Sequence, residues 1–233
     1  MGASRPSPLE LLKADLHAAV DNDPAVRGPS APWLVVFTYP GFHAIALHRL
    51  THLLYRAGVP LVPRVLALLN RFWTGVEIHP AARIGGGFFI DHGNGVVIGE
   101  TAIVGENVTL FHQVTLGGTG KETGKRHPTL KDNIVVGGGA KILGNITIGN
   151  NVYVGANSVV LRDVPDDCTV VGIPGRVVKT QGKRVTSAHA LDHIHLPDPV
   201  RDRFEELEAQ IRELRRRLGD DAPAAPRESS SES

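Results

Sequence analysis

Branched aliphatic residues recur every six positions through the middle of the chain, a period that belongs neither to helices nor to flat strands. They stand at Ile78, Ile84, Ile90, Ile98, Val104, Leu110, Leu116, Leu130, Val136, Ile142, Ile148, Val154 and Val160. A second apolar or small residue, such as Ala82 or Val108, follows most of them after four positions. The repeat predicts a coil of three short strands per turn with aliphatic side chains stacked inward. Glycine often follows the first position, as at Gly85 and Gly137, where we expect a tight corner that needs a residue without Cβ.

Helical spacing replaces this repeat before about residue 72. The predicted helices run from Pro8 to about Val20, from Pro40 to a break at Gly58–Pro60, and from there through Leu69. His48 and His52 lie four residues apart on the second helix. A metal-binding HExxH pair carries a glutamate between its histidines, and since this pair has none we expect both side chains at the surface.

A second helical pattern lies near the C-terminus. Its apolar residues, spaced alternately by three and four, are Phe204, Leu207, Ile211, Leu214 and Leu218. This spacing is typical of a short coiled coil, which we expect to form where copies of the chain are already held together. A helix folded back on its own coil is the alternative. The predicted division is an N-terminal helical region at 1–72, a β-coil at 73–180 with a protruding loop at 117–129, a linker and C-terminal helix at 181–219, and a disordered tail at 220–233.

Composition removes several classes of function. The chain has 25 Lys and Arg against 24 Asp and Glu, a formal charge of +1, so binding of nucleic acid by bulk charge is not expected. No apolar stretch approaches the ~18 residues of a membrane span, so we expect no membrane partner. Cys168 is the only cysteine, which excludes an intrachain disulfide and a cysteine-based zinc site, and we expect a cytoplasmic protein.

Charged and ring side chains stand where the six-residue repeat is interrupted. One interruption holds Glu77, the next holds Asp91-His92, and a glycine-rich loop carries Arg126 and His127. A carboxylate that fixes the tautomer of His92 would leave its other nitrogen free as a general base. A corner histidine bonded to backbone is the simpler alternative. The basic loop suits an anionic ligand.

These motifs together resemble those of a known enzyme family. The segments DHGNGVVIGET, VTLGGTG and KRHPT, within a similarity covering about residues 20 to 180, closely resemble the serine O-acetyltransferases of cysteine biosynthesis. The resemblance implies a mainly β protein, a left-handed parallel β-helix of hexapeptide repeats behind an N-terminal α-helical region. It also implies transfer of acetyl from acetyl-CoA to the hydroxyl of L-serine, giving O-acetyl-L-serine and CoA.

The resemblance implies a role for each interrupted position. His92 matches the general base, and Glu77 stands where the family places its carboxylate partner, often Asp. Asp23 and Asp91 match acidic residues that hold the substrate's ammonium group. Arg126 matches the guanidinium group that binds its carboxylate.

His127 matches a second active-site histidine, which orients the substrate and assists the tetrahedral intermediate. Acetyl-CoA is expected to lie along Gly118, Gly138 and Ala156, where small residues permit close backbone approach. Lys141 is a candidate for the phosphate groups, although a solvated lysine is the simpler interpretation. No metal is expected.

A site built from two β-helices implies at least a trimer. Longer members of the family pair two trimers into a hexamer through a larger N-terminal helical domain, and because only about 70 residues precede the coil here, we expect a homotrimer, with a hexamer as the alternative. Cysteine carries the same ammonium and carboxylate groups as serine, so we expect feedback inhibition. The chain ends Ser-Glu-Ser without the isoleucine that docks longer members into the next enzyme of the pathway, cysteine synthase, so that complex is not predicted.

Other functions remain open. The same fold could acetylate another hydroxyl acceptor, such as a sugar or an antibiotic. A metal-dependent hydratase would need His79, His92 and His112 to converge between subunits. A non-catalytic scaffold would use the β-helix only to present the C-terminal coiled coil.

Overall fold

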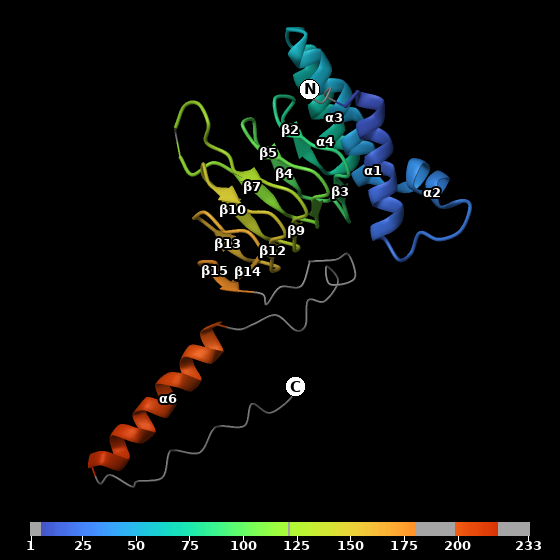
Figure 1. The fold of residues 1–233 in the computed structure, drawn as a ribbon. Helices are drawn as coiled ribbons and strands as arrows, with labels where there is room; N and C mark the ends of the chain where they lie inside the picture. Colours follow the sequence, from blue (N-terminus) through green and yellow to red (C-terminus); the bar gives the residue numbers. More distant parts are fainter. Residues whose placement is uncertain (1–5, 121, 180–198, 219–233) are drawn as a thin grey trace, which may run out of the picture. The chain divides into compact units, whose positions relative to one another are not determined.

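The computed structural model describes residues 6–120, 122–179 and 199–218, which belong to two compact units. The first unit begins with α1 (Pro8–Asn22), α2 (Ala31–Thr38), α3 (Pro40–Arg56) and α4 (Val62–Thr74). Short strands follow: β1 (Glu77–Ile78), β2 (Arg83–Ile84), β3 (Phe89–Ile90), β4 (Val97–Ile98), β5 (Ile103–Val104), β6 (Thr109–Leu110), β7 (Thr115–Gly117), β8 (Thr129–Leu130), β9 (Val135–Val136), β10 (Lys141–Leu143), β11 (Thr147–Ile148), β12 (Tyr153–Val154), β13 (Val159–Val160), β14 (Cys168–Val171) and β15 (Arg176–Lys179). The second unit is α6 (Pro199–Leu218). Figure 1 shows these elements.

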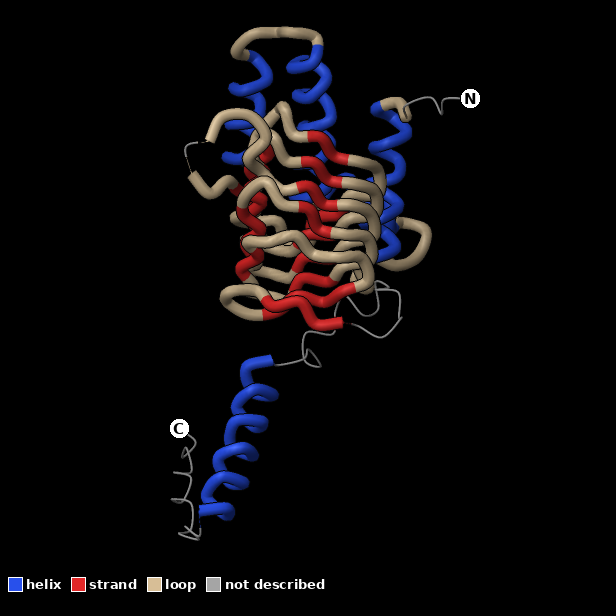
Figure 2. Tube along the Cα trace, turned by 60° about the vertical axis from the view of Figure 1, so that its left-hand side comes forward, coloured by secondary structure: helices blue, strands red, loops and turns tan. Residues whose placement is uncertain are grey.

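The strands of the first unit form the predicted left-handed parallel β-helix. From β1 to β10 each strand pairs in parallel with the strand three positions later in the chain, and β12 then pairs with β14. Sheet A has the order β1-β4-β7-β10-β13, and sheet B has the order β11-β8-β5-β2. Sheet C contains β3, β6, β9, β12 and β14, and closes with the antiparallel strand β15. Figure 2 shows the coils stacked on one another. Every turn of the chain therefore passes sheets A, B and C in that order.

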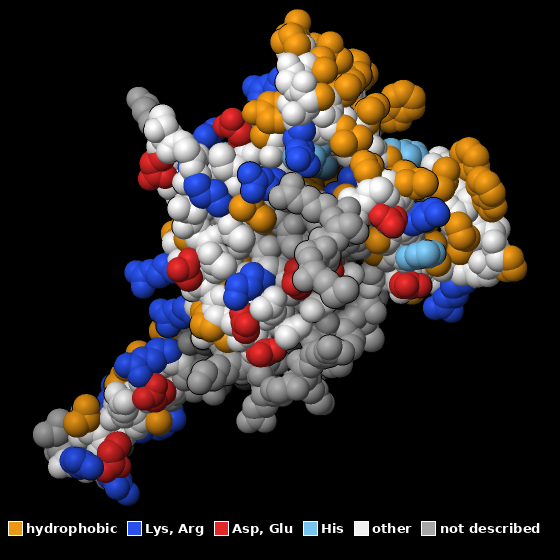
Figure 3. All heavy atoms as spheres, turned by 45° about the horizontal axis from the view of Figure 1, so that its top comes forward, with side chains coloured by type: hydrophobic (Ala, Val, Ile, Leu, Met, Phe, Trp, Pro, Cys, Tyr) orange, Lys and Arg blue, Asp and Glu red, His pale blue; other side chains and the backbone are white. Residues whose placement is uncertain are grey.

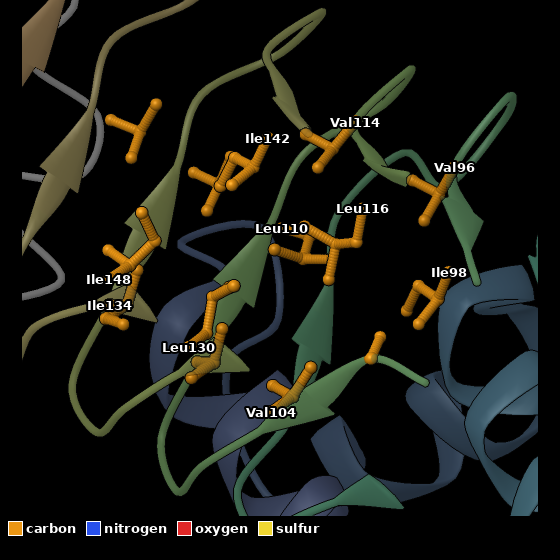
Figure 4. Packing of buried hydrophobic residues seen from close by; sticks show 14 of the residues in the cluster. Val96, Ile98, Val104, Leu110, Val114, Leu116, Leu130, Ile134, Ile142 and Ile148 are labelled. Carbon is orange, nitrogen blue, oxygen red and sulfur yellow. The ribbon is translucent and has the colours of Figure 1, made fainter. Parts of the chain in front are cut away.

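The predicted inward positions form the core of the β-helix. Ile98, Leu110 and Ile142 are each at most 1% exposed, and Figure 4 shows them stacked along the interior. Full burial of one such side chain stabilises a fold by roughly 1.5–3 kcal/mol. The six-residue repeat thus arises because each side of the coil places one aliphatic residue of its strand in the interior.

The glycines that follow these positions serve a different purpose from the one expected. Gly85 and Gly137 do not have a positive φ angle. A Cβ atom on Gly137 would lie 2.6 Å from the backbone N of Ala156 in the next coil. Left-handed backbone occurs instead at asparagines such as Asn107 and Asn157. Space between stacked coils, and not the bend of a corner, therefore selects glycine.

Helix α3 covers the N-terminal end of the β-helix. Its Ala44 and Ile45 belong to the same buried cluster as the first strands, and a Cβ atom on Gly41 would collide with the carbonyl of Ile90. This packing corrects the prediction that His48 lies at the surface, because His48 is 1% exposed. The Nδ1 atom of the half-buried His52 lies 2.8 Å from the Pro80 carbonyl oxygen.

Helix α2 was not predicted from the sequence. Its segment APWLVVFT is apolar on all sides and carries no helical period. Ala31 and Val35 pack with Phe42 and Phe89 in a second buried cluster between the helices and sheet C. Tertiary packing therefore defines this helix.

A buried ion pair joins α1, α3 and the first coil. Arg49 Nη2 lies 2.9 Å from Asp15 Oδ2. Arg49 also donates to the carbonyl of Ile84 at 2.5 Å, and the Phe88 N–H donates to Asp15 Oδ1 at 2.9 Å. These bonds fix the direction of α1, whose C-terminal end is capped by Asp23.

Helix α6 carries an exposed apolar stripe that includes Phe204, Ile211 and Leu214, flanked by ion pairs such as Arg216–Glu213 at 2.9 Å. The coiled coil and the helix folded back on its own chain both remain predictions, as do the domain boundaries. The linker at 181–198 and the tail at 220–233 lie outside the described residues. No helix in the described ranges is both long and apolar enough to cross a membrane.

Candidate active site

The predicted site residues lie at two different corners of the β-helix. The His92 corner lies between sheets C and A and carries His92, His112, Gly138 and Ala156 in successive coils. Each of these residues comes two positions after the last residue of a sheet C strand, and those last residues pair with one another in register. The His127 corner, between sheets A and B, carries Glu100 and Gly118 in the same way, together with the loop at 118–128 that holds Arg126 and His127. Sheet A separates the two corners.

At the His92 corner the imidazole is open to solvent. His92 has a φ angle of 50°, and its side chain is 80% exposed. Its Nε2 atom lies 3.8 Å from Asp91 Oδ1, beyond hydrogen-bond distance. The ring is therefore free to meet a substrate.

Two carboxylates meet beside this imidazole. Asp23 Oδ1 accepts a hydrogen bond from the Ala25 N–H at 2.8 Å, and the Tyr39 hydroxyl donates to Asp23 Oδ2. Burial raises the pKa of the Asp91 carboxyl, and although the His92 side chain opposes that shift, the Asp23 carboxylate adds to it. This pair of acids, called the acidic pocket, suits a cation such as an ammonium group.

Glu77 has another partner in this structure. Its Oε2 atom lies 2.9 Å from Arg71 Nη1, and both side chains are about half exposed to solvent. Glu77 is the first residue of β1 on sheet A. This strand pairs with β4, which is the strand that follows the His92 corner. The dyad of Glu77 with His92 remains a prediction.

At the His127 corner the second imidazole is held firmly. The backbone N–H of Thr101 donates to His127 Nδ1 at 3.2 Å, and the Thr101 hydroxyl oxygen accepts from the backbone N–H of His127 at 3.0 Å. Burial lowers the pKa of His127, and the Arg126 and Lys125 cations lower it further. Because Nδ1 accepts a hydrogen bond, the proton of the neutral ring is on Nε2. His127 therefore offers a hydrogen-bond donor.

Arg126 lies beside this ring. Its Nη2 atom donates to Glu100 Oε2 at 2.5 Å, and this hydrogen bond lowers the pKa of the Glu100 carboxyl. The Arg126 side chain is 28% exposed, so donors of its guanidinium group remain available to a carboxylate.

The expected acetyl-CoA positions follow the same two corners. Gly138 lies under His112, since a Cβ atom there would be 2.8 Å from the ring. Gly118 belongs to the other corner. Lys141 Nζ donates to the carbonyls of Gln113 at 2.9 Å and Gly139 at 2.6 Å, so both bonds hold it against the protein. The cofactor-site assignment remains a prediction.

Three residues at these corners were given no role from the sequence: Tyr39, Glu100 and Thr101. Glu100 and Thr101 lie within the DHGNGVVIGET motif, which offered a signal. Their hydrogen bonds join residues that are 26 positions apart in the sequence, and this separation depends on the length of the inserted loop. No pattern in the sequence connected Tyr39 to Asp23.

The hydratase alternative requires three converging histidines. In this chain His92 and His112 share one corner, whereas electrostatic contact places His79 near Glu100 and His127 at the other. Within the ranges that the structure describes, no three side chains of the metal-binding types are grouped to hold an ion.

Comparison with known proteins places the chain in a family. A family model for bacterial transferase hexapeptide (six repeats) matches residues 127–162. The chain is 55% identical over 210 residues to the serine acetyltransferase of Bacillus subtilis (strain 168), covering 90% of this chain and 94% of that one. It is 56% identical over 210 residues to that of Synechococcus elongatus, covering 87% and 84%.

Solved structures agree with this similarity. The serine acetyltransferase of Neisseria gonorrhoeae in complex with serine matches with a TM-score of 0.70 and 44% identity, over 73% of this chain and 69% of that one. A serine acetyltransferase in complex with cysteine matches with a TM-score of 0.72 and 42% identity, over 75% and 71%. The resemblance found in the sequence motifs is confirmed, and the chain belongs to the serine acetyltransferase family.

Proposed function

We propose that this protein transfers the acetyl group of acetyl-CoA to the hydroxyl of L-serine, releasing O-acetyl-L-serine and CoA. The observation that carries the proposal is the pairing of an acidic pocket at Asp23 and Asp91 with a guanidinium group at Arg126. An α-amino acid carries one ammonium group and one carboxylate, which match the two acids and the guanidinium group. A sugar hydroxyl acceptor has neither charge. The relative solved with serine supports this choice.

The reaction needs a base and a donor, and the two histidines supply them. His92 takes the proton of the serine hydroxyl as its oxygen attacks the thioester carbonyl of acetyl-CoA. The negative charge that develops on the carbonyl oxygen is stabilised by the Nε2–H of His127. The C–S bond then breaks, the acetyl group stays on serine, and the proton on His92 passes to the CoA sulfur. Glu77 is the expected partner of His92 in this step.

The site is completed by a second copy of the chain. Each side of the coil has six residues that rise about 3.3 Å each, so neighbouring corners lie on the order of 15–20 Å apart. L-serine is only roughly 5 Å long and cannot bridge them. The His92 corner of one copy must therefore meet the His127 corner of another, and such a head-to-tail contact forms a ring when its rotation closes. We propose a homotrimer, with the hexamer as the alternative.

Exposed apolar surface at the helical end supports assembly. Phe72 and Trp73 at the end of α4 are 91% and 84% exposed, and Leu68 and Leu69 beside them are also exposed. Figure 3 shows hydrophobic side chains gathered over this part of the first unit. A surface of this kind marks an interaction site. Because α4 leads directly into β1, it lies beside sheet A, which the two corners flank.

Acetyl-CoA then lies between the facing corners. Gly138 and Ala156 line the His92 corner below the imidazoles, and Gly118 lies on the facing corner. The absence of large side chains at these positions lets the cofactor approach the backbone. A cytoplasmic location is part of the proposal, since the chain's only cysteine, Cys168, is a buried free thiol.

Cysteine is proposed as an inhibitor that competes with serine. It carries the same ammonium and carboxylate groups, and the relative solved in complex with cysteine supports binding. Its thiol would occupy the position of the serine hydroxyl beside His92.

A thiol-release assay tests this function. With acetyl-CoA present, we expect free CoA to appear with L-serine and not with a sugar acceptor. Because L-cysteine is itself a thiol, its inhibition is followed by the loss of acetyl-CoA thioester absorbance, and added L-cysteine should raise the apparent KM for serine. The His92→Ala variant should fold normally and release no thiol above background. Thiol release with a sugar or antibiotic but not with serine would establish the alternative acceptor.

A further inference from the structure

Tyr39 is fixed where two helices and the β-helix meet. It caps the C-terminal end of α2 and the N-terminal end of α3. Its N–H donates to the Val35 carbonyl, and its carbonyl accepts from the His43 N–H, both at 3.1 Å. Two residues later, Gly41 is in close contact with Ile90, which immediately precedes Asp91. The backbone of Tyr39 is therefore set relative to the acidic pocket.

The hydroxyl of Tyr39 restrains one carboxylate of that pocket. It donates to Asp23 Oδ2, whereas the other oxygen, Oδ1, accepts from the Ala25 N–H. Asp23 follows the last residue of α1, and its neighbours Pro24 and Ala25 are exposed, so little else holds its side chain. Each oxygen keeps a lone pair beyond these bonds, which leaves the carboxylate able to bind a cation.

Electrostatic repulsion makes such a restraint necessary. Asp23 is close enough to Asp91 for its carboxylate to add to the rise in the Asp91 pKa. With no cation between them, an unrestrained Asp23 would turn toward solvent. Burial, the bond to Asp23 and the Asp91 carboxylate raise the pKa of the Tyr39 phenol well above its usual range, so the hydroxyl keeps its proton and remains a donor.

We propose that Tyr39 is a positioning residue, whose hydroxyl holds the Asp23 carboxylate toward Asp91 so that both can bind the ammonium group of the acceptor amino acid. This inference rests on the proposed function, because it assigns the acidic pocket to the serine ammonium. Tyr39 acts through Asp23 and does not touch the reacting atoms.

The Tyr39→Phe variant tests the hydroxyl alone. The ring that packs beside the cluster of α1 and α2 is retained. The free energy of a hydrogen bond to a charged group corresponds to roughly a tenfold change in an equilibrium constant. We expect KM for L-serine to rise roughly tenfold, with kcat and KM for acetyl-CoA within about twofold of wild type. Tyr55→Phe, which removes the hydroxyl of an exposed tyrosine on α3, is the matched control and should leave all three values unchanged.

A double variant separates positioning from a general loss of structure. If Tyr39 acts through Asp23, then Tyr39→Phe combined with Asp23→Ala should have the same serine KM as Asp23→Ala alone. Additive effects on KM would overturn the proposal, as would an unchanged KM in Tyr39→Phe or a variant that fails to fold. A wild-type protein that releases no thiol with serine would instead overturn the proposed function, so the two failures are distinguishable.

Discussion

Mixing two inactive variants tests whether the active site is shared between copies of the chain. His92→Ala removes the proposed base at one corner, and His127→Ala removes the proposed hydrogen-bond donor at the other. His92→Ala should lose roughly 10²–10⁴-fold in activity, as expected for a positioned proton-transfer group, and His127→Ala roughly 10²–10³-fold, as expected for one hydrogen-bond donor to a developing oxyanion. In a mixed assembly, a complete site forms where the His92 corner of an H127A copy faces the His127 corner of an H92A copy.

The expected recovery follows from the geometry of a ring. Half of the His92 corners and half of the facing His127 corners are intact in an equal mixture, so about one quarter of all sites are complete. In a ring of three, every mixed assembly contains one complete site, which is about one third of wild-type activity for mixed rings isolated by two different affinity tags. Thiol release from acetyl-CoA with L-serine measures this directly.

A matched mixture controls for recovery by any other route. Asp91 and His92 lie at the same corner, so mixing Asp91→Ala with His92→Ala leaves no complete site and should restore nothing. Isolated mixed assemblies of H92A and H127A with no more activity than the single variants would refute the shared site. They would require both corners of one chain to act on the same substrate.

Three further predictions follow from the contacts at the corners. Burial raises the pKa of the Asp91 carboxyl, so this group takes up a proton at a higher pH than an ordinary aspartate does and then no longer binds the ammonium group. KM for serine, measured from about pH 8 down to pH 5, should therefore rise as the pH falls, and a constant KM would contradict this. Gly99→Ala places a methyl group against the His127 ring and should lower kcat at least about tenfold, whereas Gly120→Ala, with no atom within 4 Å of the added carbon, should not. Asp15→Ala leaves a buried guanidinium group without its partner and should lower the free energy of unfolding by roughly 3–5 kcal/mol in urea titrations; a loss below about 1 kcal/mol would contradict the role of this pair.

The β-helix could be predicted from the sequence because its structure repeats. The inward positions from Ile78 to Val160 follow a six-residue pattern that is interrupted only by a two-residue slip after Ile90 and by the loop at 118–128, and each is buried as predicted. The N-terminal helix also ends at Asn22, where the polar run Asp21–Pro24 begins. Local periodicity was sufficient here, because a repeated environment imposes a repeated residue type.

Features that depend on contact between distant segments could not be predicted in this way. The sequence predicted His48 at the surface because the pair of histidines lacks the glutamate of a metal site, but α3 covers the end of the coil and buries it. Helix α2 has no amphipathic pattern because its exposed face is also apolar, with Trp33 and Phe37 65% and 72% exposed, so only the packing of Ala31 and Val35 marks its inner side. Tyr39 reaches Asp23 across 16 residues, with no pattern that connects them.

The sequence by itself determined the coil, its inward residues and, through its motifs, the chemistry of the residues that interrupt the repeat. Only the tertiary structure decided where those residues lie. A coil turns through three sides, so the side on which a residue lies depends on every residue counted before it, including a two-residue slip after Ile90 and the inserted loop at 118–128. That count places His92 and His127 on different corners, and this is the reason for proposing an active site shared by two chains.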